Sequence, residues 1–220
     1  MKILSTLLIF SMLLSIASFA QNAPKTIDNI QTYNELPNNK KLVLLQDSIP
    51  HLKTDLVYAT PHNFTKTQLY HSPKLLVTGA MATALRKASI QLEKEGYGLL
   101  VFDGYRPYAV SKKMWEIVHD DRYVANPVNG SDHNRGTAID ISLYDLKTGK
   151  PLPMPTPFDD FTEKAHLSYQ PTSALILSNR NLLQNTMKSV GLKPLSTEWW
   201  HFFLPNSKEF AVLNLDFSQL

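Results

Sequence analysis

Cysteine is absent from the 220 residues of the chain, whereas histidine, aspartate and glutamate are all present. Without thiols the protein can form no disulfide bond, no thiolate metal site and no lipid-modified cysteine behind an export signal. Any bound metal ion must therefore be held by histidine, aspartate or glutamate side chains.

The chain also has little excess charge of either sign. Its 22 lysines and arginines against 19 acidic residues give a formal charge of +3, and the first twenty residues contribute one lysine and no acid. The remaining excess of +2 is small and scattered, so we expect no nucleic-acid partner. With 43% hydrophobic and 19% charged residues, the composition and length are typical of one globular domain.

A long apolar run occurs at the N-terminus, where one lysine precedes it and it ends in Ser18-Phe19-Ala20. Small residues at the first and third positions before a cut are typical of a signal peptide. We predict a signal peptide over residues 1–20, a periplasmic or secreted protein, and no stable membrane anchor after cleavage. The alternative is a single membrane anchor, but the run is short for a span and no stop-transfer flank follows. Polar residues 21–41 are predicted to form a loose leader before a single domain at 42–220.

The rest of the chain contains no internal repeat and no low-complexity block, and it mixes two periodicities. Amphipathic patterns predict helices, and short apolar or alternating patterns predict strands. The expected helices are 78–96, 108–119 and 175–190, and the expected strands are 98–102, 137–143 and 198–204. Four prolines between 151 and 157 exclude regular structure there. Without a repeating βαβ rhythm, the order predicts an α+β fold with a mainly antiparallel sheet.

The stretch SDHNRGTAID, residues 131–140, places His133 and Asp140 seven residues apart. On a helix they would share a face, but Gly136 and the alternation of TAIDISL argue against a helix. We therefore expect His133 on a loop and Asp140 on the following strand, so that two elements bring two metal ligands together. The alternative is a turn histidine and a strand-edge aspartate that bind nothing.

A second candidate segment is EWWHF, residues 198–202. His201 would complete a set of three ligands, the usual number in catalytic zinc sites. On a regular strand Glu198 would face away from His201, so we expect it just before the strand or at a bulge. There it could move a proton from a zinc-bound water to the leaving nitrogen. The alternative is a core strand with a surface glutamate.

A third segment is DGYRP, residues 103–107, directly after a predicted strand. Hydrolysis of an amide builds negative charge on the carbonyl oxygen, and Arg106 could meet that charge. The alternative is an exposed arginine on a turn.

Together these segments resemble the D-alanyl-D-alanine dipeptidase family, zinc dipeptidases associated with vancomycin resistance and peptidoglycan turnover. The matching motifs are SxHxxGxAxD, ExxH and GYRP, and the similarity extends to DLVYATPHNF at 55–64 and TPFDDF at 156–161. The resemblance runs from about residue 40 to 205. It implies a small α+β sheet with zinc in a central cleft, as in other peptidoglycan metallopeptidases and the hedgehog signalling domain.

The resemblance also implies roles for individual residues. It assigns one Zn²⁺ per chain to His133, Asp140 and His201, proton transfer to Glu198, transition-state stabilisation to Arg106, and the substrate's amino end to Ser131 and Asp159. Tyr58 and His62 lie in a matching stretch without an assigned role. Pro155 stands where the family usually has glycine, which leaves the position of the Asp159 loop open.

The expected activity is hydrolysis of the dipeptide D-Ala-D-Ala to D-alanine, in peptidoglycan turnover or D-amino-acid scavenging. One alternative is a D,D-carboxypeptidase that trims terminal D-alanine from peptidoglycan peptides. Asp159 distinguishes the dipeptidase from the carboxypeptidase. A buried carboxylate that binds a free amino group disfavours longer peptides, which have no free amino group at that position. A non-enzymatic alternative is a zinc-retaining module that binds peptidoglycan or a partner, and Glu198 separates this one because such a module needs no base.

Overall fold

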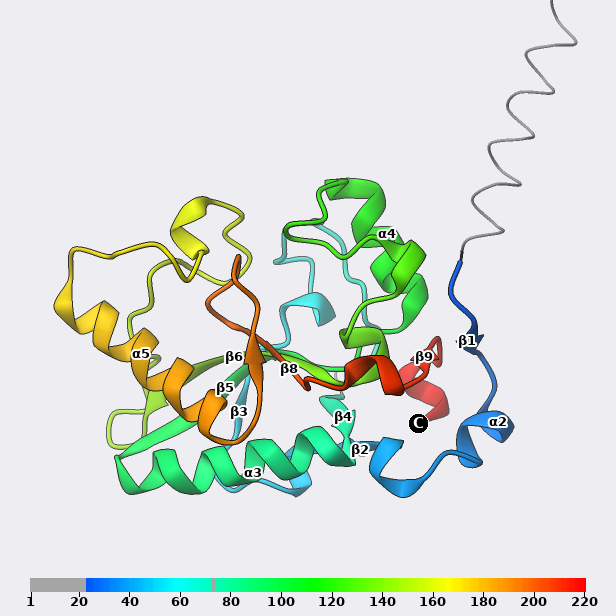
Figure 1. Cartoon of the computed structure of the whole chain (residues 1–220), viewed down its shortest axis with the longest axis horizontal. Coiled ribbons are helices and arrows are strands. Elements are labelled where there is room, and N and C mark those ends of the chain that lie inside the picture. Colours follow the sequence, from blue (N-terminus) through cyan, green and yellow to red (C-terminus); the bar gives the residue numbers. More distant parts are fainter. Residues whose placement is uncertain (1–22, 73) are drawn as a thin grey trace, which may run out of the picture.

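The computed structural model describes residues 23–72 and 74–220, so the predicted signal peptide lies outside the described residues. A five-stranded sheet forms the centre of the fold (Figure 1). Its strands, in spatial order, are β3 (Lys53–Thr54), β5 (Tyr97–Asp103), β6 (Ala138–Asp145), β8 (His201–Phe203) and β7 (Lys193–Pro194). Every neighbouring pair is antiparallel except β3 and β5. The predicted α+β fold with a mainly antiparallel sheet is confirmed.

The three predicted helices are present as α3 (Gly79–Lys94), α4 (Tyr108–Val118) and α5 (Ala174–Ser189). The α3 helix begins where the Thr78 hydroxyl accepts a hydrogen bond from the backbone N–H of Met81 at 3.4 Å. Helices α3 and α5 pack together and against strands β5 and β6, whereas α4 lies at the other side of the molecule (Figure 1). The candidate site is a cavity lined by Met114 of α4, Asp140 of β6 and His201 of β8, among others.

The segment 198–204 is a shorter strand than its composition predicts. Strand β8 includes only His201–Phe203, and the chain turns at Trp199 and Trp200. Both tryptophans are buried, and the Trp199 indole N–H donates to the Thr156 hydroxyl at 2.9 Å. The apolar residues before β8 therefore fill the core from a turn, and Glu198 stands outside the sheet ladder.

The prediction of a loose leader over residues 21–41 is wrong for most of that segment. Strand β1 (Thr26–Ile27) pairs in parallel with β9 (Val212–Leu213), and helix α2 (Ile30–Asn34) follows. The side chain of Tyr33 is buried, and its hydroxyl accepts a hydrogen bond from the Leu42 N–H at 2.7 Å. The domain therefore begins before residue 42, because the C-terminal strand supplies a partner that the polar segment cannot reveal by itself.

The remaining elements are short. Strand β2 (Leu42–Leu44) pairs antiparallel with β4 (Leu76–Thr78). The 3₁₀ helices are Asn38–Lys40, Leu45–Asp47, Val57–Ala59, Pro127–Asn129, His133–Arg135, Glu163–Ala165, Ser207–Glu209 and Phe217–Gln219. The proline-rich stretch contains no regular element, as predicted, and makes one isolated bridge between Pro151 and Tyr144. Among the described residues, no helix combines the length and the apolar character that crossing a membrane requires.

Candidate active site and metal centre

Three separate elements bring His133, Asp140 and His201 together. His133 opens the 3₁₀ helix His133–Arg135, Asp140 lies on β6, and His201 is the first residue of β8. In the register of the sheet, Asp140 pairs directly with His201. Gly136 ends the 3₁₀ helix at a φ of +63°, and a Cβ there would collide with the side chain of Leu42. The expected change from loop to strand between His133 and Asp140 is therefore present.

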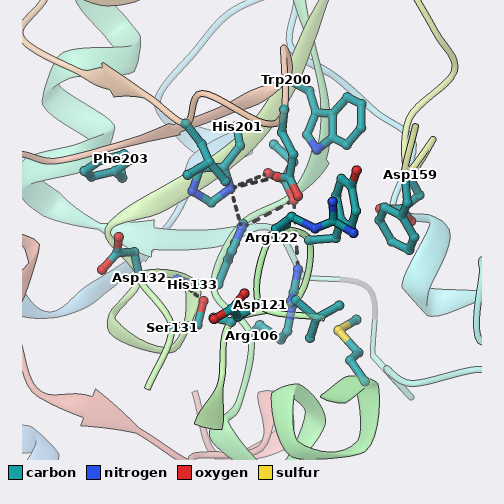
Figure 2. A pocket seen from close by; sticks show the side chains of 18 of the residues that line it. Arg106, Asp121, Arg122, Ser131, Asp132, His133, Asp159, Trp200, His201 and Phe203 are labelled. Carbon is teal, nitrogen blue, oxygen red and sulfur yellow. Dashed lines mark hydrogen bonds and ion pairs between the residues drawn. The ribbon is translucent and has the colours of Figure 1, made fainter. Parts of the chain in front are cut away.

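The three side chains form one buried cluster, and Figure 2 shows its two histidines next to each other. His201 Nδ1 lies 3.0 Å from Asp140 Oδ1 and 3.2 Å from His133 Nε2, and His133 Nε2 lies 3.4 Å from Asp140 Oδ2. One potential ligand atom from each residue lies within 4.8 Å of the other two. Such a set could hold a divalent metal ion.

The hydrogen bonding of the cluster agrees with metal binding. His133 Nδ1 lies 2.7 Å from the backbone carbonyl oxygen of Gly104, so this nitrogen carries the proton and donates it. His133 Nε2 then has a free lone pair, which is directed at the cluster. In metal sites a ligating histidine commonly donates its other ring N–H to a carbonyl or carboxylate in this way. Burial raises the pKa of Asp140, but the two imidazoles outweigh it and hold that pKa below its ordinary value. Two nitrogens and one carboxylate suit zinc with one position left open.

Glu198 lies beside the cluster without belonging to it. It precedes β8, as expected, and its Oε2 is 3.7 Å from His201 Nδ1. Burial, followed by the negative charges of Asp140 and Asp159, raises the pKa of the Glu198 carboxyl well above its ordinary value. A buried carboxyl next to a set of metal ligands is placed to accept and return a proton.

Arg106 is buried, so the alternative of an exposed turn arginine is excluded. Its Nε and Nη2 both donate to Asp103 Oδ2, at 3.0 Å and 2.7 Å, and Nη2 lies 3.9 Å from Asp140 Oδ2. The other oxygen of Asp103 accepts a hydrogen bond from the Tyr70 hydroxyl at 2.9 Å. Asp103 and Tyr70, which the sequence did not single out, thus hold the guanidinium group in one orientation at the cavity wall.

Asp159 reaches the same cavity although Pro155 precedes its loop. Its backbone has a φ of +59°, in the left-handed region. The Tyr58 hydroxyl lies 2.9 Å from Oδ1 and 3.0 Å from Oδ2 of Asp159 and donates to this carboxyl group. Burial and then the charge of Asp140 raise the pKa of Asp159 to about 7, while the Tyr58 hydrogen bond opposes that rise. Tyr58 therefore has a place in the site that its position in DLVYATPHNF left unassigned.

Ser131 also lines the cavity, but it is not next to Asp159. Its hydroxyl oxygen accepts a hydrogen bond from the His133 N–H at 3.1 Å. In Figure 2, Ser131 and Asp159 lie on opposite sides of His133. His62 lines a different pocket, with Asp55 and Lys66.

The cavity has a volume of about 220 Å³. This is below the roughly 300–1,000 Å³ of sites for drug-sized ligands, so it suits a smaller molecule. Near Asp159 its wall is aromatic: Phe161 stacks on Tyr123 with ring centroids 5.0 Å apart and meets Phe64 edge-on at 5.1 Å. The arrangement combines a metal-ligand set, a buried carboxyl, a fixed arginine and a second carboxyl at an aromatic wall.

The chain is similar to known proteins over most of its length. Residues 38–219 match the family model described as D-ala-D-ala dipeptidase. A D-alanyl-D-alanine dipeptidase of Escherichia coli (strain K12) is 33% identical over 183 residues, covering 83% of this chain and 94% of the relative. One from Enterococcus faecium is 35% identical over 190 residues, covering 73% and 93%. Among solved structures, the LdcB LD-carboxypeptidase aligns with a TM-score of 0.45 at 18% identity, covering 81% of this chain and 77% of that chain.

Proposed function

This chain belongs to the D-alanyl-D-alanine dipeptidase family of metallopeptidases, and from that premise we propose that it hydrolyses free D-Ala-D-Ala to two molecules of D-alanine. We propose one zinc ion per chain, with His133, Asp140 and His201 as its ligands. The observation that carries the proposal is the buried ligand cluster with Glu198 beside it, in a cavity of about 220 Å³ that Asp159 also lines.

The side chains divide the chemistry among them. Zinc, when bound, supplies Lewis-acid stabilisation and lowers the pKa of a water molecule. Glu198 takes the proton of the attacking water and delivers it to the amide nitrogen that leaves. The Arg106 guanidinium group donates to the carbonyl oxygen as negative charge develops there. Asp159, with Tyr58 behind it, accepts hydrogen bonds from the substrate's ammonium group. Ser131, on the other side of His133, contacts the dipeptide elsewhere along its length.

The two alternatives are less well supported. A carboxypeptidase must accommodate a chain that extends beyond the amino side of the terminal dipeptide, where Asp159 and the aromatic wall of Phe64, Tyr123 and Phe161 lie. A binding module requires no proton-transferring group, yet Glu198 lies buried next to the ligand cluster.

The proposal is tested by incubating the purified, zinc-loaded protein with free D-Ala-D-Ala and with a longer peptide that ends in D-Ala-D-Ala. Release of D-alanine is measured by a coupled D-amino-acid oxidase assay. We expect rapid release from the free D-dipeptide and little from the longer peptide. Release from the longer peptide alone would favour the carboxypeptidase, and release from neither would favour the binding module.

Replacing a ligand is expected to remove the metal. His133→Ala or His201→Ala leaves two ligands, which bind zinc weakly, and no cysteine exists to substitute. Elemental analysis after dialysis should show about one zinc per chain in the unmutated protein and far less in either variant. His62→Ala is the matched control, because His62 lies outside the cluster and should leave the metal content unchanged. Undiminished zinc in both ligand variants would show that the assigned ligands are wrong.

The pH dependence of the reaction is expected to depend on Tyr58. Ammonium binding needs the charged form of Asp159, so kcat/KM for the free dipeptide should rise with pH through the pKa of Asp159. Tyr58→Phe removes a hydrogen bond that lowers this pKa, so the rise should move to higher pH. One hydrogen bond to a charged group corresponds to roughly one to two pH units. The phenyl ring near the Arg106 guanidinium, with 5.2 Å from Cζ to the ring centroid, is kept in the variant.

The control for this shift is the N-acetylated dipeptide, which has no ammonium group. Its pH profile should not move in the Tyr58→Phe variant. An equal shift with both substrates would assign the titration to another group, such as Glu198.

We also propose that the protein is exported by its N-terminal signal and acts in peptidoglycan turnover or D-amino-acid scavenging outside the cytoplasm. The apolar run before Ala20 supports this location. N-terminal sequencing of the exported protein tests it, because cleavage after Ala20 leaves Gln21 as the first residue.

A further inference from the structure

A free dipeptide carries opposite charges at its two ends, and the residues assigned above meet only one of them. Asp159 is the proposed partner of the ammonium group, so the terminal carboxylate needs a cation elsewhere on the cavity wall. Three cationic side chains that line the cavity are Arg106, Arg122 and Lys208. Their existing contacts differ, and this difference identifies which of them can accept a new anion.

Both arginines are already paired with carboxylates. Arg106 donates twice to the buried Asp103. Arg122 Nε donates to Asp120 Oδ1 at 3.0 Å, and its Nη2 donates to Asp120 Oδ2 at 2.7 Å. This is the two-pronged geometry in which an arginine fully engages one carboxylate. Each guanidinium group still has N–H donors to spare, but its charge is already balanced by a close carboxylate, so a substrate carboxylate would gain less from it than from a loosely paired cation.

Lys208 is held much more loosely. It lies in the 3₁₀ helix Ser207–Glu209, its side chain is 71% exposed, and its Nζ is 3.5 Å from Asp132 Oδ1. An exposed pair at this distance contributes little stability. The ammonium group has three donors, so it can bind a second carboxylate without leaving Asp132. Asp132 itself is anchored by a hydrogen bond from the Ser207 hydroxyl, which keeps the lysine at the cavity.

The position of Asp132 places this lysine at the end of the cavity away from Asp159. Figure 2 shows Asp132 and Asp159 on opposite sides of His133 and His201. A dipeptide that is fully extended spans about 7 Å. With its ammonium group at Asp159 and its amide at the ligand cluster, its carboxylate is directed toward the side where Asp132 and Lys208 lie.

We infer that Lys208 binds the C-terminal carboxylate of the substrate and makes the enzyme selective for dipeptides whose carboxyl end is free. This inference rests on the proposed function. The cavity then has a negative end at Asp159 and a positive end at Lys208. These opposite charges set the direction in which a dipeptide lies across the metal ligands.

The test compares D-Ala-D-Ala with D-alanyl-D-alaninamide, in which the terminal charge is removed. We expect Lys208→Met to lower kcat/KM for the free acid about tenfold to a hundredfold, mainly through KM, and to leave the amide nearly unchanged. Lys208→Arg should restore most of the preference for the acid. Lys87→Met, at an exposed position on α3, is the matched control and should behave as the unmutated protein. Dissociation constants of both compounds, measured by calorimetry in the slow Glu198→Gln background, provide a second readout.

The possible failures are distinguishable. If the unmutated protein neither cleaves nor binds D-Ala-D-Ala, the proposed function itself fails. If it cleaves the dipeptide but Lys208→Met slows acid and amide equally, or slows neither, only the assignment of Lys208 fails. If Arg122→Met, and not Lys208→Met, selectively lowers kcat/KM for the free acid, the carboxylate partner is Arg122 and the inference is overturned.

Discussion

Replacing Glu198 with glutamine is expected to lower kcat for D-Ala-D-Ala by about two to four orders of magnitude. Glutamine has nearly the same shape but cannot accept the proton of the attacking water. Glu198 is buried, its Oε2 lies 3.7 Å from His201 Nδ1, and it is not one of the three clustered ligands, so zinc should remain bound. Stopped assays of D-alanine release measure the rate, and elemental analysis measures the metal.

The fold of this variant should be intact as well. Burial and the neighbouring charges of Asp140 and Asp159 disfavour a charged group at position 198, so a neutral amide is not expected to lower the melting temperature. Glu116→Gln, at an exposed position on α4, is the matched control for removing one carboxylate. A Glu198→Gln protein with a near-normal rate would remove Glu198 from the mechanism and revive the binding-module hypothesis.

Acetylation of the substrate's amino group is expected to lower kcat/KM by about two to three orders of magnitude. The acetylated dipeptide brings no positive charge to Asp159, and its binding leaves that carboxylate covered, without a counter-charge and with the Tyr58 hydroxyl as its hydrogen-bond donor. Stranding a buried charge costs on the order of 3–5 kcal/mol. Since burial and Asp140 raise the pKa of Asp159 to about 7, the carboxylate is charged above this pH and increasingly protonated below it. The difference between the two substrates should therefore be largest at alkaline pH and should narrow as the pH falls.

The variant that tests this assignment is Asp159→Asn. Asparagine tolerates the left-handed backbone at φ +59° better than alanine does, so the loop should keep its shape. We expect Asp159→Asn to bring the kcat/KM values of the free and acetylated dipeptides closer together, mainly by lowering the value for the free dipeptide. Asp160→Asn is the neighbouring control, because Asp160 does not line the cavity. Equal kcat/KM for the free and acetylated dipeptides in the unmutated enzyme would count against the dipeptidase and favour the carboxypeptidase.

Local patterns in the sequence were sufficient to predict the main helices and strands and the kinds of side chain that could bind a metal ion. The helix at 79–94 follows from its apolar spacing and its capping threonine, and the turn at Gly136 follows from the glycine before an alternating run. Without cysteine, a metal site had to be built from histidine and carboxylate side chains. These inferences succeed because periodicity, capping and donor chemistry act over a few neighbouring residues.

Distances between segments that are far apart in the chain were decided only by the tertiary structure. The register that sets Asp140 opposite His201, the bond from Tyr58 to Asp159 about a hundred residues away, and the pairing of β1 with β9 have no local signature. The same holds for the position of Lys208 beside Asp132. Each depends on how strands and loops pack around one common core, and hydrophobic packing selects partners by three-dimensional fit rather than by sequence spacing. The sequence by itself thus determined which groups could do the chemistry, and the packing of the sheet and its loops decided which of them meet in one cavity.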